Sequence, residues 1–519
     1  MVGDALECAP YPPSGHTRTP FTLNPLKRLA SQTAIYGVSS VLGRFLNYLL
    51  VPFLTYTFAP AEYGVIAEFY AYMGFLAVVL MFGLETGYFR FRAGGEWPPE
   101  VVYGTALRFL ALTNLAFFLL IYVQREPIAE LLRHSGHPEY VWWSAAILAL
   151  DSVGSVAFAR LRAEDRAQRF ATLKLVEIGA NVGLTIFLIY VCRRAFESDP
   201  HSLLGSLWNP SIGVGYVFIA NLAASGLKLM LLAPQFRDGF GTFRAALFGR
   251  LLRYSLPMVI IGFAGIVNEM LDRAALKYLL PFDDETNMAQ LGIYSACYKL
   301  SILMGLFIQA FRYAGEPFFF SYAKQSDARQ TYALVLNWFV ICCVFLFLLV
   351  TLYLDVFQYF VGSAYREGLS VVPVLLLASL FLGIYVNLSI WYKLTDRTLL
   401  GAGVSLIGAG ITIVLLLWWV PIYGYEGAAW AHLVCYASMV AMSYWLGRRY
   451  YPVPYEVGRV LGYVVFGVAL YLLSRGLVSG LGWNALVAGT LGLAVFVLAV
   501  LLLDVRRLTR RRGIDGGSS

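Results

Sequence analysis

Fourteen long apolar stretches, separated by short polar segments, fill most of this 519-residue chain and constrain its fold more than any other feature. Each stretch is long enough to cross about 30 Å of hydrocarbon as an α-helix, the economical way to satisfy backbone N–H and C=O groups in lipid. Composition agrees, because 59% of the residues are hydrophobic and only 13% are charged. The stretches are 31–56, 63–89, 101–123, 140–162, 171–192, 212–233, 254–280, 290–313, 331–354, 369–391, 399–420, 425–446, 457–475 and 482–503.

The sequence therefore predicts an all-α integral membrane protein with about fourteen transmembrane helices. No polar segment is long enough for a catalytic domain outside the membrane, and no GxxxxGKS or GxxxxGKT, HExxH or nucleophile–His–acid pattern occurs. The six cysteines form no CxxC, and the histidines include only one close pair, His134 and His137. Two such ligands do not make a metal site. We expect no enzyme activity, no cofactor and no metal.

The positions of Lys and Arg predict the orientation. With the N-terminus inside, 24 of the 39 fall on cytoplasmic segments and seven fall outside, as expected from the excess of positive charge in cytoplasmic loops. The seven outside are Arg125, Arg133, Arg193, Arg194, Lys277, Arg366 and Arg475. Both termini should be cytoplasmic. The net charge of +8 needs no nucleic acid, because the basic C-terminal tail suits anionic lipid of the inner leaflet.

A short internal repeat suggests two related halves. The motif EYGVI (62–66) follows the first apolar stretch, and QLGIY (290–294) follows the seventh, with their glycines 228 residues apart. Two six-helix lobes related by an axis along the membrane normal are a plan seen in several transporters. The predicted parts are a cytoplasmic N-terminal tail (1–30), an N-lobe (31–234), a cytoplasmic linker (235–253), a C-lobe (254–447), two further helices (448–505) and a basic cytoplasmic tail (506–519).

Charged residues inside the predicted spans are the strongest indication of function, because each costs at least about 2.5–3.5 kcal/mol at mid-bilayer. They are concentrated in spans 1, 2 and 4–8, which predicts a polar, net-cationic cavity built from these helices and opening between the halves. Such a cavity attracts an anion, and Arg suits phosphate. The candidate substrate-binding residues are Arg44, Asn47, Asn268, Arg273, Lys299 and Arg312.

Acidic residues in the same spans are candidates for ion coupling or ion pairing: Glu68, Asp151, Glu269 and Asp272. Simpler roles stay open. Glu269 and Arg273, four residues apart, suit an intrahelical salt bridge. Glu68 and Asp151 can bond to neighbouring helices or pair with Arg44. Lys174, Glu85 and Arg312 are placed to reach the inner headgroups.

Short signatures in a fixed order resemble the Wzx-type polysaccharide flippases of the multidrug/oligosaccharidyl-lipid/polysaccharide (MOP) superfamily. The resemblance covers roughly residues 28–450 and is carried by two central segments, 256–280 and 291–320, and by the start of the chain. The matching positions are Leu256-Pro257, Asp272-Arg273, Gly292-Ile293-Tyr294, Lys299, Glu316-Pro317, Asp151, RLRAED (160–165), 36–69 and GLETGYFRFR (83–92).

This resemblance implies a MATE-like, two-lobed transporter with two additional C-terminal helices. The implied function is alternating-access flipping of undecaprenyl-pyrophosphate-linked oligosaccharide across the bacterial inner membrane, for O-antigen, capsule or exopolysaccharide synthesis. Implied partners are this lipid, membrane lipids, a polysaccharide polymerase and glycosyltransferases. The family's cationic cavity maps to Arg44, Arg273, Lys299 and Arg312. A peptidoglycan-precursor flippase and an ion-coupled multidrug exporter are alternatives from the same superfamily, and a membrane glycan polymerase is a third.

Overall fold

The structure is a computed structural model that describes residues 25–237, 243–323 and 325–505. The predicted basic tail 506–519 and most of the predicted N-terminal tail lie outside this part of the chain. The helices are α1 (Pro25–Thr57), α2 (Pro60–Leu80), α3 (Leu84–Ala93), α4 (Pro99–Val123), α5 (Arg125–Leu131), α6 (Pro138–Ala163), α7 (Ala167–Ile186), α8 (Arg193–Ser198), α9 (Gly215–Leu231), α10 (Ala233–Phe236), α11 (Ala245–Leu279), α12 (Asp284–Tyr322), α13 (Ala328–Leu352), α14 (Leu354–Phe357), α15 (Val372–Leu388), α16 (Ile390–Leu394), α17 (Thr398–Tyr450), α18 (Val457–Leu481) and α19 (Ala485–Val500).

The described helices accommodate the fourteen predicted crossings. Eleven of the described helical stretches are long and apolar enough to span a membrane. One of them, α17, has 53 residues, about 80 Å of helix, and non-helical dihedrals at Gly424 (φ 60°, ψ −141°) divide it into two crossings. The 33-residue α1 and the 17-residue α9 supply the other two.

Two predicted boundaries differ from the observed helices. The span predicted at 63–89 is two helices, α2 and α3, because the chain turns at Phe82 and Gly83, which both have positive φ. The helix α11 begins at Ala245, inside the segment predicted as a linker. Neither difference changes the number of crossings, because α3 is too short to cross on its own.

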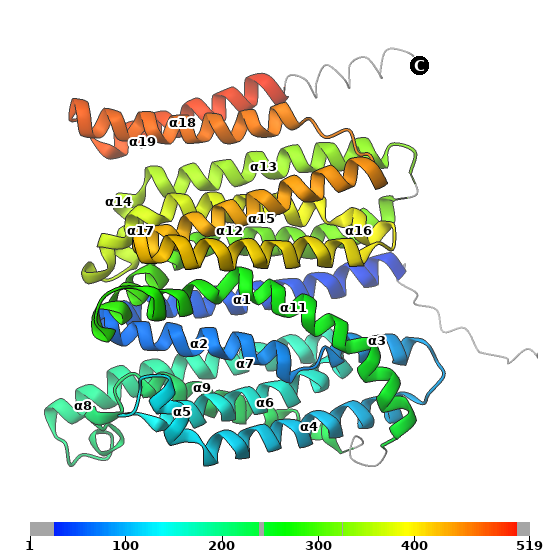
Figure 1. The fold of residues 1–519 in the computed structure, drawn as a ribbon, viewed down its shortest axis with the longest axis vertical. Helices are drawn as coiled ribbons and strands as arrows, with labels where there is room; N and C mark the ends of the chain where they lie inside the picture. The colour runs from blue at the N-terminus through cyan, green and yellow to red at the C-terminus, as the bar shows by residue number, and fades with distance from the viewer. Residues whose placement is uncertain (1–24, 238–242, 324, 506–519) are drawn as a thin grey trace, which may run out of the picture.

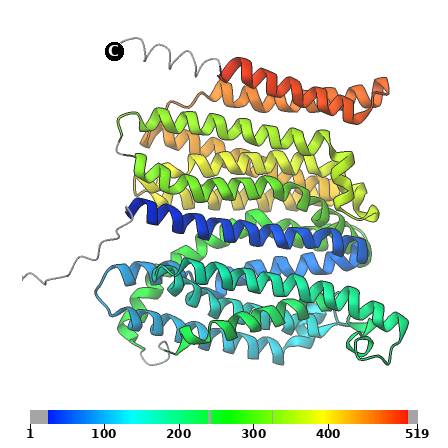
Figure 2. The same cartoon turned by 180° about the vertical axis from the view of Figure 1, so that it is seen from behind.

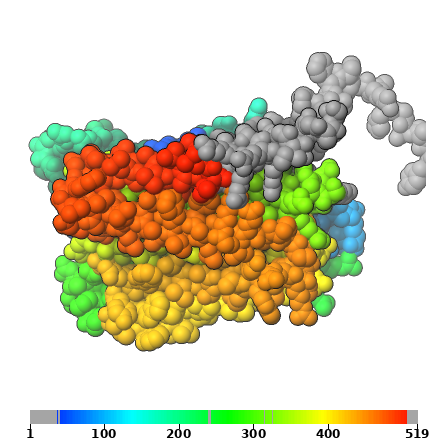
Figure 3. Space-filling model, turned by 90° about the horizontal axis from the view of Figure 1, so that it is seen from above, coloured from blue at the N-terminus to red at the C-terminus, as the bar shows by residue number. Residues whose placement is uncertain are grey.

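The helices stack side by side in one elongated bundle (Figures 1 and 2). At one end α4, α6, α7 and α9 pack together, and towards the other end α12, α13, α15 and α17 do so. Between them α1 contacts α7 and α12, and α2 contacts α11 and α12. The last two helices, α18 and α19, pack against α13 and cover the far end (Figure 3). The residue bounds of the two lobes stay a prediction.

The two glycines of the internal repeat meet where α2 crosses α12. A Cβ added to Gly64 would collide with the carbonyl oxygen of Met288, and one added to Gly292 would collide with that of Pro60. The backbones therefore touch here, as only glycine permits. If the two motifs mark equivalent positions of two halves, as predicted, this contact lies on the two-fold axis between them.

Candidate functional site

A cavity of about 560 Å³ lies against α1, α11, α12, α15 and α17. Its volume is in the usual range for a small-molecule site, about 300–1,000 Å³. On α12 the lining extends from Tyr298 to Arg312, which is about 21 Å of helix. All six residues predicted to bind substrate line it, namely Arg44, Asn47, Asn268, Arg273, Lys299 and Arg312.

The cavity differs from the prediction in the helices that build it. Polar residues of spans 2, 4, 5 and 6 were expected to contribute, but those helices supply none of the lining. The later helices α15 and α17 contribute instead, through neutral residues such as Ser379, Tyr385, Ser405 and Tyr436. These residues were missed because Ser and Tyr occur throughout membrane helices and stand out only when a charged neighbour is known.

Positive charge dominates the lining. Four cations, Arg44, Arg273, Lys299 and Arg312, face one carboxylate, Glu269. Among the described residues Arg44, Lys299 and Arg312 form no ion pair, and neither does Glu269. Gln309, three residues before Arg312, is buried with its Oε1 atom lacking a hydrogen-bond donor. The cavity therefore presents uncompensated cations and hydrogen-bonding groups to whatever enters it.

Arg273 is the cation held most firmly. Its Nη1 donates to Asp272 Oδ1 (2.7 Å) and to the backbone carbonyl of Glu269 (2.5 Å), and its guanidinium lies 4.3 Å from the centroid of the Tyr298 ring. The hypothesis of a Glu269–Arg273 salt bridge is not what the geometry shows. The ion pair is made by Asp272, and Glu269 contributes only its backbone.

Asn268 fixes the cavity wall more than it faces the cavity. It is buried, and its Nδ2 donates to the carbonyl of Ser405 (3.3 Å) while its Oδ1 accepts from Thr412 (3.1 Å). Tyr436 donates to the carbonyl of Asn268 (3.2 Å). The side chain thus joins α11 to α17, the helices that carry Arg273 and the aromatic lining.

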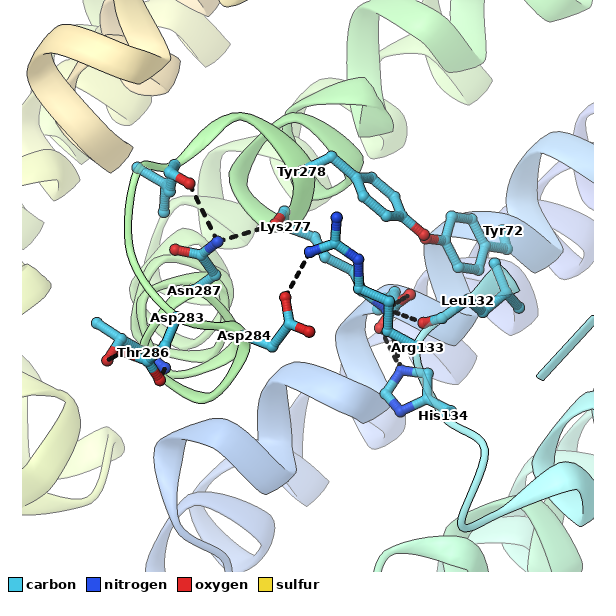
Figure 4. Close-up of polar contacts among 12 residues, drawn as sticks. Tyr72, Leu132, Arg133, His134, Lys277, Tyr278, Asp283, Asp284, Thr286 and Asn287 are labelled. Atoms are coloured by element: carbon cyan, nitrogen blue, oxygen red, sulfur yellow. Dashed lines mark hydrogen bonds and ion pairs between the residues drawn. The ribbon is translucent and has the colours of Figure 1, made fainter. Parts of the chain in front are cut away.

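The acidic candidate Glu68 lies outside the cavity and is paired. Its carboxylate is fully buried and accepts from Lys277 Nζ (2.6 Å), and the other oxygen bonds to His134 Nε2 (2.8 Å). Lys277 also donates to the carbonyl of Leu132 (2.5 Å), and Figure 4 shows Lys277 of α11 meeting Leu132 and His134 of the segment between α5 and α6. Lys277, which the sequence assigns to the outer side, is buried in the last turn of α11.

The turn between α11 and α12 is itself cross-linked around Lys277. Asn287 donates to the carbonyls of Lys277 (3.1 Å) and Leu280 (3.2 Å). Asp283 caps α12 by accepting from Thr286, and these hydrogen bonds hold the pKa of Asp283 below its ordinary value. These bonds fix the end of α11, which carries Lys277, against the start of α12 (Figure 4).

Asp151 belongs to a separate network in the first half of the chain. It accepts from Ser225 (2.7 Å) and from the buried Lys228 (2.5 Å), which also bonds Glu177 (2.8 Å). Lys174 pairs with the same Glu177 (2.9 Å). Pairing of Glu68 or Asp151 with Arg44 is therefore not observed. The candidate Glu85 pairs with Arg162, across from α3 to α6.

Asp272 lies directly behind the cavity wall. Its second oxygen accepts from Tyr294 (2.6 Å) and bonds His432 Nε2 (2.8 Å). His432, Lys277, His134 and Lys228 bond to the predicted acidic residues, and the sequence did not single them out as partners. The only signal for them was a titratable side chain near a predicted span, and the partner of each is 66 or more residues away in sequence, except for Lys228 with Glu177.

Comparison with known proteins identifies the fold. No family model matches the chain, and no curated protein matches it in sequence. Among solved structures, the lipid II flippase MurJ in an inward closed conformation matches with a TM-score of 0.67 and 14% identity, over 91% of this chain and 98% of MurJ. A MATE structure in the straight conformation gives 0.58 and 12%, over 85% and 97%. An inward-facing multidrug resistance MATE transporter of the MOP superfamily gives 0.55 and 13%, over 84% and 98%.

These matches cover nearly the whole length of each chain. They agree with the fold class predicted from the sequence, which is all-helical, membrane-spanning and MATE-like. Identities of 12–14% carry no information on substrate. The chain is a multi-pass integral membrane protein with the fold of the MurJ and MATE structures.

Proposed function

We propose that the protein is a transporter, and more specifically a flippase for undecaprenyl-pyrophosphate-linked oligosaccharide in surface polysaccharide synthesis. The observation that carries the proposal is the cavity with four cations and a single carboxylate. The charged pyrophosphate is the part of such a lipid that crosses the hydrocarbon core least easily. Arginine guanidinium groups and a lysine ammonium group are suited to bind phosphate oxygens. The setting we propose is a bacterial inner membrane with both termini cytoplasmic.

The neutral part of the lining suits the sugars of the same substrate. Asn47, Ser301, Gln309, Ser379 and Tyr385 offer hydrogen-bond donors and acceptors along the cavity. A lipid II flippase has the same fold, so this fold is compatible with transport of a lipid-linked substrate. We expect a polymerase and glycosyltransferases as functional partners, and alternating access as the mode of transport.

A multidrug exporter is the second candidate because the MATE structures share the fold. A cationic drug would meet a repulsive surface in this cavity, where Glu269 is the single lining carboxylate. The charge of the cavity therefore favours an anionic substrate. A peptidoglycan-precursor flippase is compatible with the same cavity, whereas a glycan polymerase has no reactive group in it to argue from.

Deletion of the gene tests the proposal in cells. We expect surface polysaccharide to disappear while the lipid-linked repeat unit accumulates on the cytoplasmic leaflet, detected by its accessibility to membrane-impermeant reagents. Unchanged surface glycan in a strain without a second flippase gene would refute the function. Loss of viability with arrested cell-wall synthesis would assign the peptidoglycan precursor instead, and loss of dye efflux would assign the exporter.

Variants of the cavity test which residues act. Arg44→Ala and Arg273→Ala should each abolish complementation of the deletion while the protein reaches the membrane at normal levels. The matched control is Arg193→Ala, which removes a cation from an exposed pair with Glu197 far from the cavity. We expect normal polysaccharide from the control. Full activity of both cavity variants would remove the electrostatic basis of the proposal.

A further inference from the structure

His432 is a buried histidine whose second ring nitrogen has no partner. The residue is 2% exposed, and its Nε2 lies 2.8 Å from Asp272 Oδ2. An ionised carboxylate only accepts hydrogen bonds, so Nε2 carries the proton. Nδ1 is then a bare acceptor, and it has no hydrogen-bond partner in the described structure. An unsatisfied buried polar atom of this kind asks for an explanation beyond packing.

The carboxylate of Asp272 connects this histidine to the cavity. One oxygen bonds His432 and the other bonds Arg273, which lines the cavity. When His432 is neutral, the negative charge of Asp272 and the positive charge of Arg273 cancel. A proton on Nδ1 gives the three residues a net charge of +1, and the single carboxylate is then shared by two cations. Arg273 is left with less compensation, so the cavity becomes more positive.

The other titratable and charged groups near His432 do not offset this added charge. From α12, Tyr294 donates to Asp272 and Tyr298 lies 6.1 Å from the imidazole, centroid to centroid. On α17 itself, the Tyr436 ring lies 5.8 Å away. Besides Arg273, the adjoining cavity is lined by one carboxylate, Glu269 from α11, and three cations: Arg44 from α1 and Lys299 and Arg312 from α12.

We propose that His432 is a proton-binding site coupled to anion binding in the cavity, an inference that rests on the proposed function and adds its coupling to protons. Binding of the anionic headgroup moves one proton from water onto Nδ1, and release of the headgroup returns it. Because coupling free energies are reciprocal, the proton strengthens anion binding by the factor by which the anion strengthens proton binding.

Calorimetric titration of the purified protein with undecaprenyl pyrophosphate, in buffers of different ionisation enthalpy, tests the site. The phosphates of the ligand also titrate, so each proton count is compared with that of His432→Gln, which keeps a donor for Asp272 but binds no proton. Near pH 7 the wild type should take up up to about one proton more per bound lipid than His432→Gln. Between pH 8 and pH 6, the affinity of the wild type for the lipid should rise about tenfold more than that of His432→Gln. This factor is within the usual range of coupling free energies.

The matched control is His134→Gln, since His134 also bonds a buried carboxylate, Glu68, but lies outside the cavity lining. It should take up protons like the wild type. Equal proton counts and parallel pH profiles for the wild type and His432→Gln would overturn the inference while leaving the proposed function intact. Absence of lipid binding by the wild type at every pH would overturn both.

A second measurement keeps the site testable if His432→Gln does not fold. Infrared difference spectra of ¹³C-histidine-labelled wild type, with and without lipid, should show a new imidazolium band on binding. The chain has five histidines, and the same band should persist in labelled His134→Gln. Lipid binding without an imidazolium band would refute the proposal.

Discussion

Removing the positive charge of Lys277 should destabilise the protein more than any exposed charge removal. In Lys277→Met the carboxylate of Glu68 stays fully buried and loses the donor at 2.6 Å. The carbonyl of Leu132 loses the same donor. Only His134 still bonds the carboxylate.

The expected loss follows from the burial of both partners, whose side chains are 2% and 0% exposed. Breaking a buried ion pair by removing one member costs about 3–5 kcal/mol, because the remaining charge is left without compensation. Replacing both members by apolar residues is often close to neutral. We therefore expect Glu68→Leu/Lys277→Met to be clearly more stable than the Lys277→Met variant.

Reversible unfolding in mixed detergent micelles measures these differences. The matched control is Arg250→Met, which breaks the ion pair of Arg250 with Glu96, whose side chains are 59% and 57% exposed. Like the Glu68–Lys277 pair, the Arg250–Glu96 pair joins segments far apart in the chain. Exposed pairs contribute about 0.2–1 kcal/mol, so the control should lose no more than that.

Two outcomes would refute this reasoning. One is a loss in Lys277→Met no larger than in Arg250→Met. The other is additivity, in which the double variant loses the sum of the losses of Glu68→Leu and Lys277→Met. Residues in direct contact should instead show a coupling energy, and its absence would mean that Glu68 and Lys277 do not form a pair in the folded protein.

Two further predictions concern the repeat contact and the cavity. Gly292→Ala should lower the free energy of unfolding by about 1–3 kcal/mol, because the added methyl group collides with the backbone of Pro60. The control Gly403→Ala adds a methyl group where there is open space and should be neutral or stabilising. Equal melting temperatures of the two variants in detergent would contradict the close approach of α2 and α12. Glu269→Gln should tighten binding of undecaprenyl pyrophosphate about fivefold. A carboxylate about 8 Å from the bound anion, at an effective dielectric constant of about 40, repels it by about 1 kcal/mol. Unchanged or weaker binding, measured by calorimetry, would show that the anion binds elsewhere.

Much of the fold was predictable because lipid leaves few choices. The alternation of apolar and polar segments located the crossings, including the division of α17 near Gly424, where Pro421 and Gly424 interrupt a continuous apolar run. The turn at Phe82 and Gly83 was missed, because the flanking residues keep the composition of a single span. Only the packing of Gly83 against the carbonyl of Ser255 shows why the chain turns there.

The charged members of the cavity lining were predictable, but the pairing of the other charges was not. Arg44, Lys299 and Arg273 stood out because a cation inside a span is costly wherever it lies. Which carboxylate neutralises which cation depends on how distant helices pack. Glu68 and Lys277 are 209 residues apart, and Asp272 and His432 are 160 apart. Nothing in the local pattern around either member specifies its partner.

The pairing of the acids outside the cavity explains why the cations in the cavity remain uncompensated. Two acids outside the cavity each have a cation partner in direct contact, Glu68 with Lys277 and Asp151 with Lys228. Their charges therefore do little to offset the field at the cavity. Arg44, Lys299 and Arg312 have no carboxylate partner among the described residues, and each uncompensated cation in a span costs at least about 2.5–3.5 kcal/mol. Water in the cavity lowers that cost, and an anion lowers it further, so the cost of these cations becomes binding energy for a phosphate-bearing headgroup.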